Sequence, residues 1–237
     1  MLGLGLSTGL APARPGGIAA LAPLAWYDAG HGPALYQDAA GTTPASEAGQ
    51  PVRRLSSRAG GAPALTIGAT GAPASRTATG VGFAGAGVYL KASLAIPASH
   101  AIIVKARIDS WSAHHGDLFC CHGAKGTELR AGDPSAFRAL VIGSDVAIDP
   151  MEAGGDWSGS HVFTLVLDAA GATARLRIDG TEVAADAGYD GSLTSPTEFK
   201  LFGSRWNSAY VSGELRHAVI LGSADLGAVA AAEAALA

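Results

Sequence analysis

The stretch that decides the fold is HVFTLVLDAAGATARLRIDG, residues 161–180. Apolar side chains recur at every second position in both halves of it, as they do along a half-buried strand. In the first half these are Phe163, Leu165 and Leu167, and in the second half Ala174, Leu176 and Ile178. The stretch therefore predicts a β-hairpin that presents one apolar face to a core.

Two turns accompany this hairpin. Ala169-Ala170-Gly171 lies between its halves, and Gly171 is expected to take a positive φ, which other residues avoid. Asp179-Gly180 follows the second half and predicts another tight turn, because this dipeptide is a strong turn signal. The two halves and both turns together predict antiparallel pairing.

Short apolar or alternating runs separated by Gly, Pro and Asp predict the remaining strands. We expect them at residues 24–28, 52–55, 64–67, 81–83, 88–90, 101–108, 118–121, 137–142, 199–203 and 213–221. Ser223 or Asp225 can cap a final helix over 226–236, because a short side-chain oxygen accepts the free N–H groups of a first turn. Many short strands with one short C-terminal helix predict an all-β fold, a two-sheet antiparallel sandwich.

The length of 237 residues suits one large all-β domain with an attached arm. Residues 1–23 are rich in Gly, Ala, Pro and Leu and show no clear period. Such a segment is either a mobile tail or an N-terminal arm that orders against a partner. Residues 24–237 form the predicted domain, within which residues 60–79 are expected to be long surface connections.

Composition limits the possible partners. Charged residues make up only 15% of the chain, which favours a protein packed against neighbours, such as a homo-oligomer. The net charge of −4 and the lack of a basic run make nucleic acid an improbable partner. No apolar run approaches the roughly 18 residues needed to span a bilayer, so we expect no membrane insertion. The first residues lack the basic region of a secretory signal.

The cysteines predict neither a disulfide framework nor a metal site. Cys120 and Cys121 are adjacent, so they would point to opposite faces of a strand as two reduced thiols. With His114, His115 and His122 they match no familiar zinc spacing. We therefore expect no cofactor.

The carboxylates do not predict hydrolysis. A retaining glycosidase needs two carboxyl groups about 5–5.5 Å apart, which on one strand means acidic residues two positions apart. The acidic residues that we considered show no such alternation and are expected to be solvated turn carboxylates: Asp109, Asp117, Asp145, Asp149, Glu152 and Asp156. No Gly-x-Ser-x-Gly elbow or phosphate loop is present either. The sequence therefore favours a non-enzymatic protein.

Aromatic residues in loops point to sugar binding. Trp206 and Tyr210 offer flat faces on which the C–H face of a sugar stacks, and Asn207 between them can pair with hydroxyls. Arg205 can add a charge-assisted bond to an acidic sugar. An equally weighted alternative is that Trp206 folds back and caps the sandwich. Trp157, just before the hairpin, is a further carbohydrate-binding candidate for which a structural role is favoured.

Three stretches in order resemble the laminin-G-like, concanavalin A-like lectin and glucanase family of jelly rolls. They are residues 161–180, residues 199–203, and residues 213–221 with the helix after them. The resemblance covers about residues 81–237 and implies a jelly-roll sandwich. Because related jelly rolls often bind calcium, it leaves a calcium ion open as an alternative to no cofactor.

A second resemblance lies at residues 24–29 (LAWYDA), 35–44 (LYQDAAGTTP) and 49–52 (GQPV). These resemble the opening of jelly-roll proteins of tailed bacteriophages and gene transfer agents. That family usually continues with Trp or Tyr, an acidic residue and an Asn-Gly turn, where this chain has LSSRAGG at 55–61.

This second resemblance implies a structural protein of a phage-like particle, such as a head spike, fibre or tail component. Its arm, residues 1–23, would join other particle proteins, and its jelly roll would bind cell-surface glycan for host attachment. We expect it on the particle surface after synthesis in the bacterial cytoplasm. The alternatives are a pure assembly or decoration protein that binds no glycan, and a polysaccharide-degrading enzyme.

Overall fold

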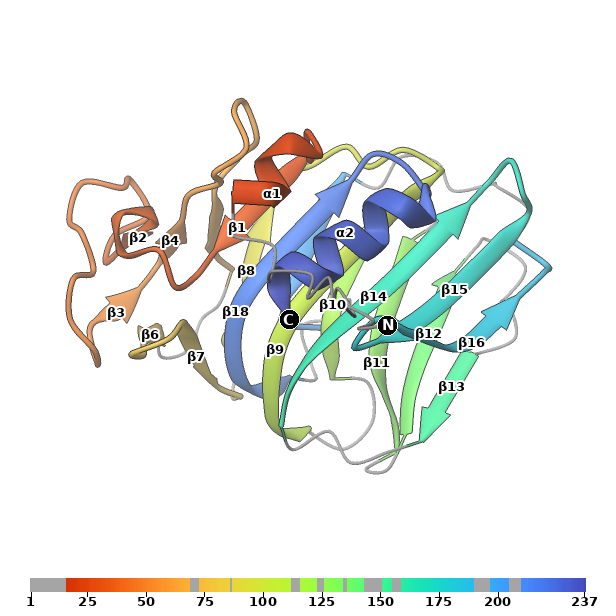
Figure 1. The fold of residues 1–237 in the computed structure, drawn as a ribbon. Coiled ribbons are helices and arrows are strands. Elements are labelled where there is room, and N and C mark those ends of the chain that lie inside the picture. The colour runs from red at the N-terminus through yellow and green to blue at the C-terminus, as the bar shows by residue number, and fades with distance from the viewer. Residues whose placement is uncertain are drawn as a thin grey trace, which may run out of the picture.

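The computed structural model describes residues 16–68, 73–85, 87–111, 116–122, 126–133, 136–142, 151–154, 159–189, 197–204 and 210–237. Within these ranges two antiparallel sheets lie face to face, and two helices lie on the outer side of one of them (Figure 1). The predicted two-sheet jelly-roll sandwich is thereby confirmed. No helix in this described part of the chain is long and apolar enough to cross a membrane.

The sheet that carries the helices, here called sheet A, has the strand order β16-β15-β14-β9-β18-β7-β6-β3, and β1 also pairs with β18. Its strands are β1 (Ala25–Asp28), β3 (Pro51–Val52), β6 (Ala74–Arg76), β7 (Val81–Ala84), β9 (His100–Trp111), β14 (Ser160–Asp168), β15 (Thr173–Ile178), β16 (Thr181–Asp186) and β18 (Val211–Leu221).

The second sheet, here called sheet B, has the order β13-β12-β11-β10-β17-β8-β5-β4-β2. Its strands are β2 (Leu35–Tyr36), β4 (Arg54–Leu55), β5 (Leu65–Ile67), β8 (Leu90–Ala92), β10 (Asp117–His122), β11 (Gly126–Asp133), β12 (Ala136–Ile142), β13 (Met151–Gly154) and β17 (Glu198–Leu201). A short 3-10 helix, η1 (Gly32–Ala34), precedes β2.

The predicted hairpin is β14 and β15, and its register places Leu165 opposite Leu176. Phe163, Leu165 and Leu167 are all buried in the core between the two sheets, as the alternation predicted. On β15 the apolar residues face the same core, whereas Arg177 faces away from it. Since β9 pairs with β14 on its other side, the hairpin is joined directly to the centre of sheet A.

One of the two turn predictions is wrong. The residue with positive φ between β14 and β15 is Ala172 (φ 52°), not Gly171. A Cβ on Gly171 would lie 2.5 Å from Oδ2 of Asp168, whose Oδ1 accepts hydrogen bonds from the N–H groups of Ala170 and Gly171. Gly171 is therefore needed for close approach rather than for backbone conformation.

The Asp179-Gly180 turn is confirmed. Both residues have positive φ (49° and 79°), the conformation that two-residue hairpin loops of type I′ require. Asp179 also accepts a hydrogen bond from the backbone N–H of Val162 through Oδ1 and contacts His161 through Oδ2. The turn therefore fastens β15 and β16 to the start of β14.

Two helices cover the outer face of sheet A (Figure 1). Helix α2 (Leu226–Leu236) begins where predicted, and the carboxylate of Asp225 caps it by accepting a hydrogen bond from the N–H of Gly227. Helix α1 (Gly16–Ala20) packs beside α2. The apolar layer under both helices consists of Ile18, Trp26, Ala101, Ile103, Val162, Val166, Val219, Leu221, Val229, Ala232 and Leu236.

Part of the predicted arm therefore lies on the body of the protein. Ile18 of α1 is only 1% exposed, because its side chain is covered by the layer under the helices. Residues 1–15 lie outside the described residues. The role of residues 1–23 as an attachment arm stays a prediction.

The expected strand at residues 52–55 is divided between the two sheets. β3 pairs with β6 in sheet A, and β4 pairs with β2 and β5 in sheet B. The chain crosses from one sheet to the other at Arg53, so no single strand spans these residues. The strand expected at 88–90 is also displaced, since β8 starts at Leu90.

Candidate functional site

Four of the five predicted carbohydrate-binding residues lie outside the described residues: Trp157, Arg205, Trp206 and Asn207. The fifth, Tyr210, is partly exposed and forms an antiparallel bridge with Gly203, just after β17. The phenol end of its side chain lies 3.9 Å from the position that a Cβ would take on Gly87. Tyr210 therefore lies at the end of β17, near Gly87 in the segment that leads into β8.

A second aromatic residue, Tyr89, lies at the same end of sheet B. A Cβ on Gly203 would come within 2.5 Å of Cβ of Tyr89, and a Cβ on Gly68 would overlap its ring at 2.1 Å from Cε2. The side chain of Tyr89 therefore fits between residues 68 and 203 only because both are glycines and have no side chain. Sequence reasoning missed Tyr89 because its signal, two glycines far apart in the chain, becomes apparent only after folding.

Tyr89 also contacts a charged residue. The ammonium group of Lys200 on β17 lies 5.3 Å from the ring centroid, within the range of a cation–π interaction. Tyr89 is 5% exposed and the side chain of Lys200 is 4% exposed. This lysine–aromatic pair is therefore buried, at the same end of sheet B as Tyr210.

A row of polar side chains crosses the outer face of sheet B at this level. The register pairs Tyr36 with Arg54, Arg54 with Thr66, Thr66 with Lys91 and Lys91 with Lys200, so one residue comes from each of five adjacent strands. We call these five residues the outer row. Because side chains alternate along a strand, these residues face away from the core that holds their chain neighbours. Those core neighbours are Leu35, Leu55, Leu65, Leu90 and Phe199.

One carboxylate serves two lysines of the outer row. The two oxygens of Glu198 lie 3.1 Å from Nζ of Lys91 and 3.1 Å from Nζ of Lys200. The hydrogen bond to Glu198 raises the pKa of Lys91. Burial raises the pKa of Glu198, but the hydrogen bonds from both lysines outweigh this effect, so its pKa lies below the usual value. Lys91 and Glu198 are therefore both charged at neutral pH.

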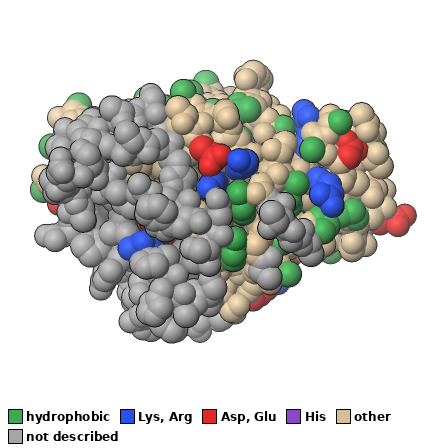
Figure 2. Space-filling view, turned by 180° about the vertical axis from the view of Figure 1, so that it is seen from behind, with side chains coloured by type: hydrophobic (Ala, Val, Ile, Leu, Met, Phe, Trp, Pro, Cys, Tyr) green, Lys and Arg blue, Asp and Glu red, His purple; other side chains and the backbone are tan. Residues whose placement is uncertain are grey.

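Arg54 has no carboxylate partner among the described residues. Its Nη1 donates to the carbonyl oxygens of Ala39 and Ala40 at 3.2 and 3.1 Å, which fixes the loop after β2. A space-filling view of the side opposite Figure 1 shows basic side chains at intervals over the described surface and acidic atoms beside one group of them (Figure 2). The outer row and Glu198 together hold three basic groups and one acidic group, a net charge of +2.

The outer face of sheet B also contains buried acidic residues. Asp117 on β10 is 1% exposed and Glu128 on β11 is 2% exposed. The prediction that Asp117 is a solvated turn carboxylate is therefore wrong, because β10 begins at this residue and buries it. Glu128 lies 3.3 Å from Nη1 of Arg130 on the same strand. Asp117 and Glu128 come from neighbouring strands, so no alternation along a single strand could indicate that both are buried on this face.

The two cysteines lie on opposite faces of β10, as expected, and both are buried. Cys121 lies in the core, and burial raises its pKa to about 12. Cys120 faces outward and its Sγ donates to the carbonyl of Gly203 at 3.4 Å. Burial, and then the nearby charge of Asp117, raise its pKa well above the usual value. Neither thiol is prepared for nucleophilic attack, which needs the thiolate.

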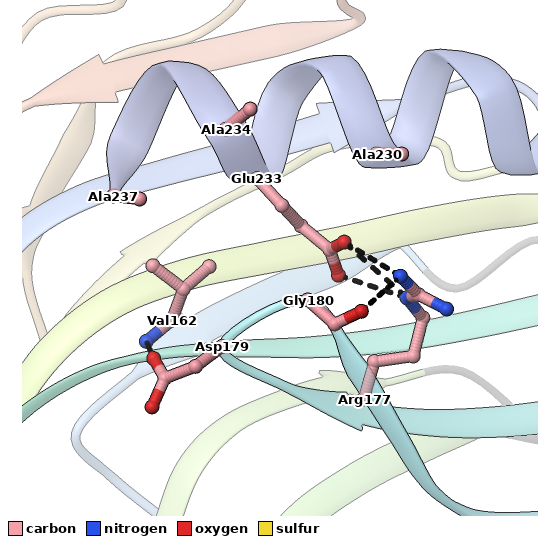
Figure 3. A pocket seen from close by; sticks show the side chains of 8 residues that line it. All are labelled: Val162, Arg177, Asp179, Gly180, Ala230, Glu233, Ala234 and Ala237. Atoms are coloured by element: carbon pink, nitrogen blue, oxygen red, sulfur yellow. Dashed lines mark hydrogen bonds and ion pairs between the residues drawn. The ribbon is translucent and has the colours of Figure 1, made fainter. Parts of the chain in front are cut away.

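A separate pocket lies on the helix side, between α2 and the hairpin of β14 and β15 (Figure 3). Its volume is about 320 Å³. Ala230 and Ala234 of α2 line one side, and Arg177 and Glu233 meet across it in an ion pair of 3.0 Å. Since the guanidinium and the carboxylate neutralise each other, this pair serves to hold the helix on the sheet.

No protein-family model matches the chain, and neither does any curated protein sequence. Solved structures do match it. The binding domain of botulinum neurotoxin DC in complex with SialylT is 8% identical, with a TM-score of 0.58 over 77% of this chain and 49% of that chain. A structure of botulinum neurotoxin type C, described as depending on two ganglioside molecules for cell entry, is 8% identical, with a TM-score of 0.61 over 86% and 50% of the two chains.

The sialidase of Trypanosoma rangeli in complex with 2,3-difluorosialic acid is 11% identical, with a TM-score of 0.59 over 91% of this chain and 33% of that chain. This chain thus spans half the length or less of these three structures. At such identities the likeness concerns the fold alone. The protein is therefore a jelly-roll β-sandwich.

Proposed function

We propose that this protein is a non-enzymatic structural component of a phage-like particle whose jelly roll binds glycans on a host surface. The glycan-binding part of this proposal rests on a difference between the outer face of sheet A and the outer face of sheet B. Helices α1 and α2 cover the outer face of sheet A, whereas the outer row occupies that of sheet B and ends beside Tyr89, close to Tyr210. Arg54, Thr66 and Lys91 of this row are partly exposed, and we propose this part of sheet B as the ligand surface.

Several features support sugar as the ligand. The outer row offers hydroxyl, ammonium and guanidinium groups, and sugar hydroxyls pair with such groups. Tyr210 lies at its end with an aromatic face of the kind on which sugars stack. Matching solved structures include a toxin binding domain with a sialylated ligand and a sialidase with a sialic acid analogue.

The particle role has a different basis. It rests on the resemblance of residues 24–52 to phage and gene-transfer-agent jelly rolls and on the apolar, weakly charged segment 1–23. Attachment to other particle proteins through this segment, display on a particle surface and homo-oligomer formation belong to the same proposal.

A glycan array with the full chain tests the sugar-binding part. We expect binding to a restricted set of cell-surface glycans, and at least tenfold weaker binding by a Trp206→Ala, Tyr210→Ala double variant that keeps its melting temperature. A control, Val183→Ala, removes an exposed apolar side chain from β16 of sheet A, away from the proposed ligand face, and should change nothing. If the double variant binds as well as the parent, the ligand lies elsewhere. An array without any bound glycan would favour the alternative, a pure assembly protein.

Asp117 and Glu128 motivate a test for hydrolysis. They come from neighbouring strands, but both are buried and the carboxylate of Glu128 is already held by Arg130 at 3.3 Å, so neither is placed to reach a glycosidic bond. We therefore propose no hydrolase activity. Release of reducing ends from capsular polysaccharide, lost in a Glu128→Gln variant, would contradict this.

A further inference from the structure

We infer that the pocket between α2 and the hairpin of β14 and β15 receives the apolar N-terminal segment, residues 1–15, of a second copy of this chain. We call this pocket the helix groove. The inference rests on the homo-oligomer part of the proposed function and names the two surfaces that would meet. In a two-fold dimer each copy supplies one segment and receives one, so the contact is made twice.

The helix groove has a volume of about 320 Å³ and mostly apolar walls. Ala230 and Ala234 of α2 line one side, and Val162 of β14 lies across from them (Figure 3). Both alanines are exposed, since they do not belong to the apolar layer between α2 and sheet A. A volume at the lower end of the range for small-molecule sites suits a few apolar side chains rather than a folded domain.

The charged groups that line the helix groove are already paired. Arg177 and Glu233 form an ion pair of 3.0 Å. Asp179 accepts a hydrogen bond from the N–H of Val162 at 2.8 Å, and its other oxygen lies 2.7 Å from Nδ1 of His161. A charged ligand would have to compete with these contacts, whereas an apolar segment leaves them intact.

The two helices beside the groove have an uncharged outer surface. Residues 17–24 and 226–237 contain one ionisable side chain, Glu233, which is 4% exposed and paired. Helices on a free surface usually carry charged or polar residues on the side that faces water. Leu24 and Leu226 are two of the three large apolar side chains that the described part of the chain leaves exposed. A partner that covers this side would remove apolar surface from water.

Residues 1–15 have the composition and the starting point to fill the groove. Their sequence, MLGLGLSTGLAPARP, has leucines at positions 2, 4, 6 and 10 and one ionisable side chain, Arg14. They join the described chain at Gly16, the first residue of α1, which packs beside α2. Fifteen residues extend to at most about 50 Å, so a segment that starts on one copy can reach the same side of a neighbour.

The position of α1 favours a second copy over the chain's own segment. Helix α1 lies beside β1, whereas the groove lies on the other side of α2, next to β14 and β15 (Figure 1). The chain's own segment would have to pass over α2 before it entered the groove. The segment of a neighbour approaches from outside and covers the exposed helices at the same time.

Complementation between two variants tests this inference. One variant lacks residues 1–15 and keeps the groove, and the other keeps the segment but carries Ala234→Arg, whose long charged side chain occupies the groove. Light scattering should show self-association at least tenfold weaker than in the parent for each variant alone, and a heterodimer in their equimolar mixture. Ala231→Arg is the matched control, because Ala231 is exposed on the same helix but does not line the groove, and it should associate like the parent.

A peptide with the sequence of residues 1–15 gives a second measurement. It should bind the truncated protein equally at low and high salt, because no ion pair is formed, and it should not bind when Ala234→Arg is added. Ala230→Arg replaces Ala234→Arg if the latter lowers the melting temperature. Absence of peptide binding to the truncated protein would overturn the inference.

The outcomes separate this inference from the proposed function. A monomeric parent would overturn both the groove and homo-oligomer formation. An oligomeric parent whose association is unchanged by Ala234→Arg would overturn the groove alone. A lower melting temperature in both the truncated and the Ala234→Arg protein, without any change in mass, would assign the groove to the chain's own segment and overturn the second copy.

Discussion

Arg177 of β15 and Glu233 of α2 are joined by three hydrogen bonds, from Nε to Oε1 at 3.0 Å, from Nε to Oε2 at 3.3 Å and from Nη2 to Oε2 at 3.0 Å. The Arg177 side chain is 15% exposed and that of Glu233 is 4% exposed, so little water competes for the pair. Arg177 also donates to the carbonyl of Gly180 at 2.6 Å. The last helix is thereby fastened to the hairpin that decides the fold (Figure 3).

Loss of this pair should be costly. Glu233→Ala leaves the guanidinium largely buried and without its carboxylate, so we expect the free energy of unfolding to fall by about 2–4 kcal/mol. Urea denaturation measures this. Glu182→Ala breaks the exposed pair with Arg175 on the same strand and should cost at most about 1 kcal/mol. Equal costs for the two variants would show that α2 is not held by this contact.

The core side of the hairpin should be equally sensitive. Leu165 is 0% exposed between the sheets, so Leu165→Ala should lower the free energy of unfolding by about 2–5 kcal/mol. Val183→Ala on the edge strand β16, where the side chain is 40% exposed, should change it by less than about 0.5 kcal/mol. A change that small for Leu165 would mean that the register of β14 is wrong.

Stability should fall in mild acid because of His100. This residue is 0% exposed, and burial lowers its pKa from 6.5 to about 4. Between these values the unfolded chain takes up a proton that the folded chain does not, so stability decreases as the pH falls from about 7 to 4, by about 3 kcal/mol from this group. Denaturation of the parent and of His100→Gln at several pH values measures the difference, and parallel curves would contradict it.

Gly68 should not tolerate a side chain. A Cβ there would lie 2.1 Å from Cε2 of Tyr89, so Gly68→Ala must displace the ring and should cost about 1–3 kcal/mol. Gly60→Ala is the control, because a Cβ at that position meets nothing within 4 Å. Adding Tyr89→Leu to Gly68→Ala should recover part of the loss. A neutral Gly68→Ala variant would mean that the ring does not lie over this glycine.

Removal of residues 1–15 tests the attachment arm and leaves α1 in place. Since Ile18 and the rest of α1 remain packed on α2, we expect an unchanged melting temperature. We also expect loss of oligomer formation, measured by light scattering after size exclusion. A truncated protein that assembles like the parent would show that these residues have no such role.

Features that depend on local patterns could be predicted from the sequence. The hairpin, the Asp179-Gly180 turn and the helix capped by Asp225 all follow from residues a few positions apart. The alternation along β14 placed Phe163, Leu165 and Leu167 in the core, because side chains of a strand alternate between its two faces.

Other features depended on contacts between distant residues. Strand β11 has the sequence GTELRAGD, with a single large apolar residue, Leu129, and forms because β10 and β12 pair with it on both sides. The edge strand β16 is mostly exposed and gives no burial signal. Asp117 was expected in a solvated turn and is buried instead, because β10 pairs with both β11 and β17.

The sequence by itself determined which segments become strands with an apolar face, since the spacing of apolar residues along the chain requires no partner. Only the tertiary structure decided that Tyr36, Arg54, Thr66, Lys91 and Lys200 form one row and that Tyr89 fits between Gly68 and Gly203. A row across a sheet is set by inter-strand hydrogen bonds and register. These join residues far apart in the chain, and no local pattern records them.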